Sequence, residues 1–378
     1  MTDPVELTVE LIRCPSVTPE EAGALDLLES LLSAHGFACT RVPRGGVDNL
    51  YARWGTASPV FAFNGHTDVV PVGDVGAWTV DPFGGVINDG MVWGRGAADM
   101  KSGVAAFAAA AIAFVEETPP EGSVVLMITG DEEGRAVDGT QAILDWMEET
   151  GEKADFCLVG EPTSLARLGD VVKIGRRGSM TASMTVTGRQ GHTAYPDRAI
   201  NPLPAIAKAC LRLSETPLDL GSTHFQASTL ALTTIDTGNP SNNVIPAEAT
   251  AVFNIRFNDL HAPEDIRIWT DQIVEEALKG TGCTAEIEWS VSGESFLTPP
   301  GPLSDIVVDA ITDRTLERPA LTTGGGTSDA RMIKAHCPVL EFGLVGDTMH
   351  QVDERVPEED IRALSVLYGD ILHRFFGV

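Results

Sequence analysis

Phe61-Ala-Phe-Asn-Gly-His66-Thr-Asp68 is an apolar run that leads directly into an imidazole and a carboxylate. A short apolar run bounded by Gly and polar residues is typical of a buried β-strand. Four further apolar runs end in the same way: residues 91–93 lead to Asp99, 123–129 to Glu132 and Glu133, 156–159 to Glu161, and 339–342 to His350. Five strands are therefore predicted, each with carboxylate or imidazole groups near its carboxyl end.

Helical patterns lie between these strands. Residues 4–14, 20–35, 101–117 and 139–150 have the apolar spacing of helices that cover a sheet. Strands that alternate with helices predict an α/β domain with a mostly parallel central sheet. The carboxyl ends of parallel strands form the ligand crevice of such a sheet, so the acidic and imidazole groups are expected to converge there.

The middle of the chain follows a different order. Strand patterns at 179–187, 228–236, 249–257 and 284–291 are combined with helical patterns at 201–214 and 263–279. The resulting β-α-β-β-α-β order is typical of a ferredoxin-like α+β unit. We therefore expect an inserted domain at residues 179–292, within a first domain formed by residues 1–178 and 293–378.

Composition excludes several classes of protein. The 378 residues include 26 Lys and Arg against 54 Asp and Glu, a formal charge of −28, which argues against nucleic acid or an anionic membrane as partner. The longest apolar stretch, Gly103–Val115, is shorter than the roughly 20 residues that span a bilayer. Six scattered cysteines without a Cys-x-x-Cys pair favour free thiols, and hence a cytoplasmic location.

The predicted convergence of acids and histidines points to metal ions. Several carboxylates at one place repel one another unless cations lie among them. Oxygen and imidazole ligands suit Zn²⁺, Mn²⁺ or Co²⁺, and the supply exceeds the three protein ligands of one catalytic zinc. Two ions that share a carboxylate fit better. Each motif alone could equally be a strand end or a solvated loop, and the spacing does not pair the ligands.

Five motifs together resemble the dizinc aminoacylase/carboxypeptidase family. They are His66-Thr-Asp68-Val-Val-Pro71, Gly94-Arg95-Gly-Ala-Ala-Asp99-Met-Lys101, Gly130-Asp-Glu132-Glu133-Gly134, Gly160-Glu161-Pro162-Thr163 and Gly324-Gly-Gly-Thr-Ser-Asp329. The resemblance covers nearly the whole chain. It implies a dizinc-peptidase-like catalytic domain, residues 1–178 and 293–378, with residues 179–292 as an inserted dimerisation domain.

The resemblance also implies a role for each site residue. Asp99 would bridge two zinc ions (Co²⁺ and Mn²⁺ share such ligands), and its peptide bond to Met100 would be cis. The remaining metal ligands would be His66 and Glu161 for one ion, and Glu133 and His350 for the other. The catalytic residues would be Glu132 as general base and then general acid, Asp68 as the partner of His66, and His192, which would polarise the scissile carbonyl of a partner subunit in a homodimer.

The substrate loops are similar to one branch of the family. That branch releases succinate from the small molecule N-succinyl-L,L-2,6-diaminopimelate in lysine biosynthesis. Its substrate-binding positions would be Arg176, Ser179, Tyr195, Asn242, Asn243, Arg256, Gly326 and Thr327. Gly346 departs from the branch, which tends to have Asn there. The alternatives are a related amidohydrolase, such as an acetylornithine deacetylase or an aminoacylase, and a non-catalytic binding module that would have lost a ligand or the base.

Overall fold

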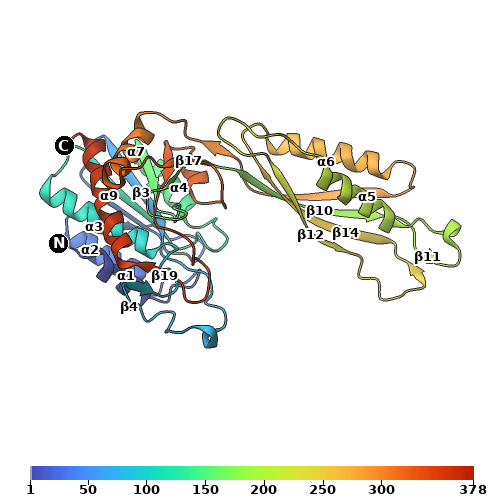
Figure 1. Ribbon diagram of the computed structural model, residues 1–378, viewed down its shortest axis with the longest axis horizontal. Coiled ribbons are helices and arrows are strands. Elements are labelled where there is room, and N and C mark those ends of the chain that lie inside the picture. Colours follow the sequence, from blue (N-terminus) through green and yellow to red (C-terminus); the bar gives the residue numbers. More distant parts are fainter. Residues whose placement is uncertain (1) are drawn as a thin grey trace. The chain divides into compact units, whose positions relative to one another are not determined.

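The chain divides into two compact units, shown in Figure 1, a ribbon drawing of the computed structural model, which describes residues 2–378. Unit 1 comprises residues up to Ile174 together with Thr298–Thr322 and Ser328–Val378, and unit 2 comprises Gly175–Leu297 and Thr323–Thr327. These limits lie four and five residues from the expected boundaries. The reason is that β9 (Gly175–Arg176) pairs with β16 (Phe296–Leu297), and this ladder belongs to unit 2.

An eight-stranded sheet forms the centre of unit 1. Its strands follow the order β1-β2-β6-β3-β7-β18-β8-β17. The bounds are β1 Ala38–Arg41, β2 Leu50–Trp54, β6 Ser123–Thr129, β3 Val60–His66, β7 Phe156–Val159, β18 Val339–Glu341, β8 Val171–Lys173 and β17 Ala320–Thr322. Strands β6, β3, β7 and β18 are parallel neighbours. The predicted α/β domain with a parallel centre is therefore confirmed.

One of the five predicted strands does not belong to this sheet. Residues 91–93 do form a strand, β5 (Met91–Trp93), but it pairs with β4 (Val86–Asn88) and β19 (Arg355–Pro357) in a separate antiparallel sheet. Asp99 therefore reaches the site on a loop from this small sheet. The expectation that all five strand ends share one sheet is wrong in this respect, because an isolated apolar run does not specify its pairing partner.

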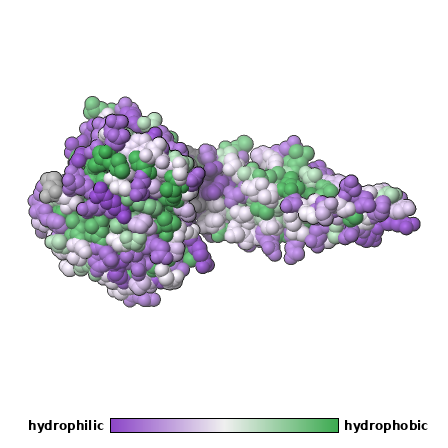
Figure 2. Space-filling view, turned by 90° about the horizontal axis from the view of Figure 1, so that it is seen from below, coloured by the Kyte–Doolittle hydropathy of each residue, from purple (hydrophilic) through white to green (hydrophobic). Residues whose placement is uncertain are grey.

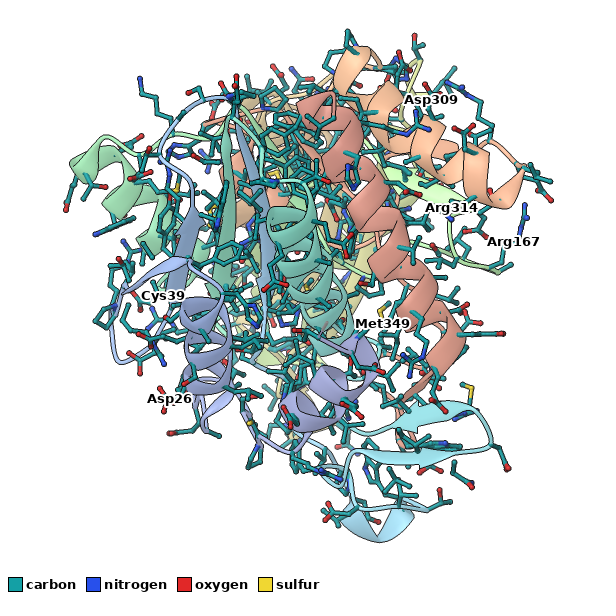
Figure 3. All side chains as sticks on the ribbon, turned by 90° about the vertical axis from the view of Figure 1, so that its left-hand side faces the viewer. Asp26, Cys39, Arg167, Asp309, Arg314 and Met349 are labelled. Atoms are coloured by element: carbon teal, nitrogen blue, oxygen red, sulfur yellow. The ribbon has the colours of Figure 1, made fainter. Side chains whose placement is uncertain are left out.

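Helices cover the central sheet. Helices α1 (Pro4–Ile12), α3 (Lys101–Glu117) and α9 (Glu358–Phe376) pack against one another, and α3 lies against β3, as Figures 1 and 3 show. Arg314 of α7 (Pro302–Thr315) forms an ion pair with Asp370 of α9. The other helices of unit 1 are α2 (Ala24–Ala34), α4 (Thr140–Thr150), α8 (Ala330–Ile333) and the 3-10 turn η1 (Val75–Ala77).

Unit 2 contains a four-stranded antiparallel sheet of order β12-β14-β10-β15. Its elements are, in chain order, β10 Gly178–Thr187, α5 Pro202–Glu215, β12 Thr229–Asp236, β14 Glu248–Phe257, α6 Pro263–Leu278 and β15 Thr284–Gly293. Helices α5 and α6 pack against each other, and residues such as Met184 and Phe253 form a separate core. This is the ferredoxin-like arrangement predicted from the sequence. A two-stranded ladder, β11 (Gly191–His192) with β13 (Val244–Ile245), and the turn η2 (Pro196–Arg198) complete the unit.

The surface hydropathy, the helix lengths and the state of the cysteines are consistent with what the composition predicts. Figure 2 shows hydrophilic residues over most of the visible face, with hydrophobic residues in small patches. Within residues 2–378, no helix combines the length and apolar character that a membrane span requires. All six cysteines are free thiols, and Cys157, Cys210 and Cys337 are buried.

Candidate metal centre

Three parallel strands deliver site residues at their carboxyl ends. His66 is the last residue of β3 and lies in register with Thr129, the last residue of β6. Glu132 and Glu133 follow β6 within four residues, and Glu161 follows the end of β7. Because neighbouring parallel strands end at the same edge of the sheet, residues almost a hundred positions apart meet there.

Asp99 lies between the two histidines. One of its carboxylate oxygens, Oδ1, is 3.2 Å from His66 Nε2, and the other, Oδ2, is 3.3 Å from His350 Nε2. The peptide bond from Asp99 to Met100 is cis, as predicted. One carboxylate that faces an imidazole on each side has the arrangement needed to bridge two metal ions.

The remaining carboxylates complete a group around each histidine. Glu161 Oε1 is 3.9 Å from His66 Nε2, whereas Glu133 Oε1 is 2.8 Å from His350 Nε2. Possible ligand atoms of His66, Asp99 and Glu133 lie within 4.8 Å of one another, and so do those of His66, Glu132 and Glu161. The structure thus brings together all five predicted metal ligands. Which of them bind metal stays a prediction.

The pKa shifts in the cluster indicate an excess of negative over positive charge. Burial and the neighbouring carboxylates raise the pKa of Glu132 to about 8 and the pKa of Glu161 well above its usual range. Hydrogen bonds with Asp99 and Glu133 raise the pKa of His350 to about 10. Burial opposes ionisation of Asp99, but hydrogen bonds with His350 and His66 lower its pKa. A protonated imidazole partly compensates the negative charge of the carboxylates around it, which is the role that bound cations would otherwise have. The donor set therefore fits two divalent ions.

Asp68 contacts His66 differently from the simplest expectation. His66 Nδ1 lies 2.8 Å from the backbone carbonyl oxygen of Asp68, whereas the carboxylate Oδ1 is 3.6 Å away. The carboxylate instead accepts hydrogen bonds from the backbone N–H groups of Glu132 and Glu133, at 3.2 and 3.1 Å. Asp68 therefore fixes the loop that carries the predicted base as well as the imidazole. The sequence motif alone did not indicate this second contact.

Two further residues shape the site without a signal in the motif spacing. The carboxylate of Asp131 accepts hydrogen bonds from the backbone N–H groups of Arg135, Val137 and Asp138 at 3.0 Å and so holds the loop after β6. At Gly103 in α3, a Cβ atom would lie 2.6 Å from the carbonyl oxygen of Gly160. Only glycine lets α3 approach the strand end that carries Glu161 so closely.

Unit 2 contains a group of arginines near the start of β10. Ser179 and Arg256 are register partners in β10 and β14, and Arg176 Nη1 donates to the carbonyl oxygen of Gly326 at 3.1 Å. Arg177, the next residue in the same sequence motif, belongs to this group, since burial and the charge of Arg256 lower its pKa. Adjacent guanidinium groups that repel each other are typical of a site for an anionic ligand.

A second group in unit 2 surrounds His192. The backbone N–H of Thr193 donates to the carbonyl oxygen of Asn243 at 3.1 Å, and the rings of His192 and Tyr195 lie 5.8 Å apart. Strand β10 has ten residues and separates this group from Ser179. At about 3.3 Å per residue, the eight steps from Ser179 to Thr187 span about 26 Å. The predicted substrate residues of unit 2 thus form two groups, with Asn242 and Asn243 in the one around His192.

Gly346, the departure from the family pattern, has little free space. A Cβ atom there would lie 3.2 Å from Met349 Sδ and 3.3 Å from Pro162 Cβ. Met349, labelled in Figure 3, precedes His350, and Pro162 follows Glu161. A larger residue at position 346 would therefore require a small shift of the Met349 or Pro162 side chain, both next to predicted ligands.

Comparison with known proteins identifies the family. The profile of peptidase family M20/M25/M40 matches residues 62–374. The chain belongs to this family, which confirms the resemblance seen in the motifs. All the ligand candidates and the predicted base are present, so the alternative of a non-catalytic binding module is not favoured.

Relatives with high sequence identity indicate a more specific class of enzyme within this family. A succinyl-diaminopimelate desuccinylase of Cereibacter sphaeroides is 61% identical over 377 residues, 99% of each chain. Succinyl-diaminopimelate desuccinylase 1 of Ruegeria sp. is 59% identical and covers 100% of this chain and 99% of the relative.

Solved structures agree on the fold. Aminopeptidase PepT from Bacillus cereus has a TM-score of 0.79 at 19% identity over 98% of both chains. The Bacillus subtilis protein YXEP, described as a dinuclear metal-binding peptidase, has a TM-score of 0.77 at 16% identity over 99% of this chain and 98% of that one. At such low identities these structures show the shared fold alone.

Proposed function

We propose that the chain hydrolyses the amide bond of N-succinyl-L,L-2,6-diaminopimelate to succinate and L,L-diaminopimelate, as a cytoplasmic step of lysine and diaminopimelate biosynthesis. The main structural support for this chemistry is the position of Asp99, which faces His66 with one carboxylate oxygen and His350 with the other. The choice of substrate rests on the relatives, which are named as desuccinylases and match over their full length.

Two zinc ions would be held at the cluster in unit 1. His66 and Glu161 would bind one ion, Glu133 and His350 the other, and Asp99 both. When bound, such ions lower the pKa of water and polarise a carbonyl oxygen. The donor set supports this assignment, because it offers two imidazoles, His66 and His350, and three carboxylates without a thiolate.

Glu132 is our candidate for the proton transfers. Possible ligand atoms of Glu132, His66 and Glu161 lie within 4.8 Å of one another, so its carboxylate lies directly beside the proposed metal ligands. A positioned carboxylate can take up a proton from water and return it to a leaving group. In the reaction it takes a proton from the attacking water as the C–O bond forms. It then gives that proton to the departing amine as the C–N bond breaks.

His192 is suited to stabilise the oxyanion. Its Nδ1 accepts a hydrogen bond from the backbone N–H of Ala194 at 3.0 Å, so the neutral ring carries its proton on Nε2. The side chain is exposed, and Nε2–H is free to donate to an oxygen outside its own unit. Such a donor stabilises the negative charge of the tetrahedral intermediate.

A homodimer explains why the unit 2 residues form two groups. The part of β10 from Ser179 to Thr187, about 26 Å, is longer than one extended substrate molecule, and His192 follows the end of that strand, so we infer that the two groups of one chain contact different substrate molecules. We therefore propose that Arg176, Ser179 and Arg256, with the Gly326–Thr327 loop, bind substrate carboxylates in one subunit. His192, Tyr195, Asn242 and Asn243 would come from the partner subunit.

Three substrates test this proposal. The purified chain, loaded with Zn²⁺, is assayed on N-succinyl-L,L-diaminopimelate, N-acetylornithine and an N-acetyl amino acid, with and without a chelator. We expect succinate release from the first compound with a kcat/KM at least 100-fold above the other two, loss with chelator, and recovery when Zn²⁺ is returned. No succinate release by the metal-loaded chain would contradict the proposed substrate.

The dimer has a separate test. Inactive chains with His192→Ala are mixed with inactive chains with Glu132→Gln, and the mixture is assayed after subunit exchange. If His192 acts in the partner's site, mixed dimers regain one intact site and activity rises toward a quarter of wild type. No recovery in dimers whose exchange has been verified would contradict action in trans.

A further inference from the structure

Arg95 and Glu354 form a buried ion pair beside the candidate metal centre, yet neither is a ligand candidate. Arg95 Nη1 lies 2.6 Å from Glu354 Oε2, and the two side chains are 3% and 0% exposed. Both residues belong to unit 1. A buried ion pair costs desolvation energy on both sides, so stability alone gives no reason for its place here.

Glu354 holds the backbone of the predicted bridging ligand. Its second oxygen, Oε1, accepts hydrogen bonds from the backbone N–H groups of Ala98 and Asp99, at 2.8 and 3.1 Å. These N–H groups lie on the loop between β5 and α3, outside any regular ladder. The carboxylate therefore fixes the backbone from which the Asp99 side chain projects between His66 and His350.

Arg95 holds the segment of the other ligand. Its Nη1 also donates to the carbonyl oxygen of Gln351 at 3.1 Å, and its Nη2 to the carbonyl oxygens of His350 and Pro71 at 3.4 Å. The guanidinium also lies over the ring of Trp78, 5.3 Å from its centroid. A planar fork with several donors can serve all these acceptors at once, whereas a lysine ammonium cannot.

The Arg95–Glu354 ion pair lies directly next to the ladder between β5 and β19. Trp93 of β5 is the register partner of Arg355 of β19, and the backbone N–H of Gly94 donates to the carbonyl oxygen of Glu354 at 2.9 Å. The chain leaves β5 toward Asp99 and enters β19 from His350. The side chains of Arg95 and Glu354 thus join the two segments at the point where backbone pairing ends.

We propose that Arg95 and Glu354 are positioning residues that set the distance between Asp99 and His350. They thereby set the affinity of the ion that these two ligands share with Glu133. This inference rests on the proposed dinuclear centre but not on the identity of the substrate. The other ion shares Asp99 but takes its remaining ligands, His66 and Glu161, from the ends of β3 and β7. The pair does not contact these strand ends in any hydrogen bond found among residues 2–378, so the affinity of this ion should change less.

Metal titration tests the inference directly. Wild type, Arg95→Lys and Glu354→Gln are freed of metal with a chelator and titrated with Co²⁺, followed by calorimetry and by the visible absorption of the bound ion. We expect two binding steps in wild type. In each variant one step should weaken by roughly 10–100-fold, the range found when partners of metal ligands are changed, while the other changes less than threefold.

The matched control is another arginine–glutamate pair of unit 1. Arg53 Nη1 contacts Glu152, and both side chains are partly buried. Arg53→Lys should lower the melting temperature without changing either binding step. Excess Co²⁺ should restore kcat of Arg95→Lys with the substrate KM unchanged, which global destabilisation would not produce.

Three results would overturn the inference: two unchanged binding steps in both variants, equal weakening of both steps, or selective weakening in the Arg53→Lys control. A wild-type chain that binds fewer than two ions would overturn it together with the proposed metal centre. A chain that binds two ions but releases no succinate would overturn only the proposed substrate.

Discussion

His350 Nε2 lies 2.8 Å from Glu133 Oε1, although 217 positions separate the two residues in the sequence. Glu133 follows the central strand β6, and His350 lies in the loop that precedes β19. Their contact joins the C-terminal part of the chain to the carboxyl end of a strand from its first half. The candidate metal centre therefore exists only when unit 1 is fully folded, and its ligands can be tested one at a time.

Glutamine at position 132 should separate chemistry from metal binding. Glu132→Gln keeps the size of the side chain but cannot accept and return a proton. We expect kcat to fall by roughly 10²–10⁴-fold while the bound metal, measured by elemental analysis, is unchanged. Glu149→Gln on the exposed face of α4 is the matched control and should keep wild-type turnover. A Glu132→Gln enzyme with near-normal kcat would exclude this residue as the base.

Removal of each histidine should release one ion. His66→Ala should lose the ion bound with Glu161, and His350→Ala the ion bound with Glu133, because His66 Nε2 lies 3.9 Å from Glu161 Oε1 and His350 Nε2 lies 2.8 Å from Glu133 Oε1. Dialysed variants should each contain close to one ion per chain by elemental analysis. Two tightly bound ions in either variant would show that the missing imidazole is not a ligand.

Asparagine at position 68 should disturb the loop that carries Glu132. The Asp68 carboxylate accepts two backbone N–H groups, and an asparagine side chain has only one acceptor oxygen for them. The unpaired N–H should lower stability by about 1–3 kcal/mol, measured by denaturant unfolding, and kcat should fall while metal content stays the same. Asp74→Asn, at an exposed site, is the control. Equal losses of kcat in both variants would remove the special role of Asp68.

Gly103→Ala should destabilise the protein through a steric clash. The added Cβ would lie 2.6 Å from the carbonyl oxygen of Gly160, so α3 or the end of β7 must shift next to Glu161. We expect a lower melting temperature and weaker binding of the ion held by His66. Gly369→Ala in α9 makes the same change in open space and should stabilise by up to about 1 kcal/mol. If both variants melt alike, the close approach at Gly103 has no energetic consequence.

Thiol reactivity should follow burial. Six free thiols should react with an aromatic disulfide reagent in denaturant, whereas in the native protein Cys157, Cys210 and Cys337 should stay unreactive. Burial raises the pKa of Cys337 to about 12, and the thiolate is the reactive form. Fewer than six thiols in the denatured, unreduced chain would contradict the absence of disulfides.

Much of the fold could be predicted from residue patterns. The helix at 101–117 has the predicted bounds, and the order of strands and helices in unit 2 follows from periodicity within contiguous segments. Strand pairing could not be predicted in the same way. Residues 91–93 form a strand as predicted, but its partners are β4 and β19, since hydrogen-bonding partners of a short apolar run are chosen by contacts distant in sequence.

The sequence by itself determined which chemical groups are present and in what order: the ligand candidates, the candidate base Glu132, and a ferredoxin-like insert. Only the tertiary structure decided how they combine. It placed Asp99 between His66 and His350. It also brought the Asp68 carboxylate to the backbone N–H of Glu132 and the Glu354 carboxylate to the backbone N–H of Asp99. The physical reason is that a motif specifies donors and acceptors along one segment. Which groups meet depends on how strands and loops from distant segments pack, and burial at that meeting point then sets their charge.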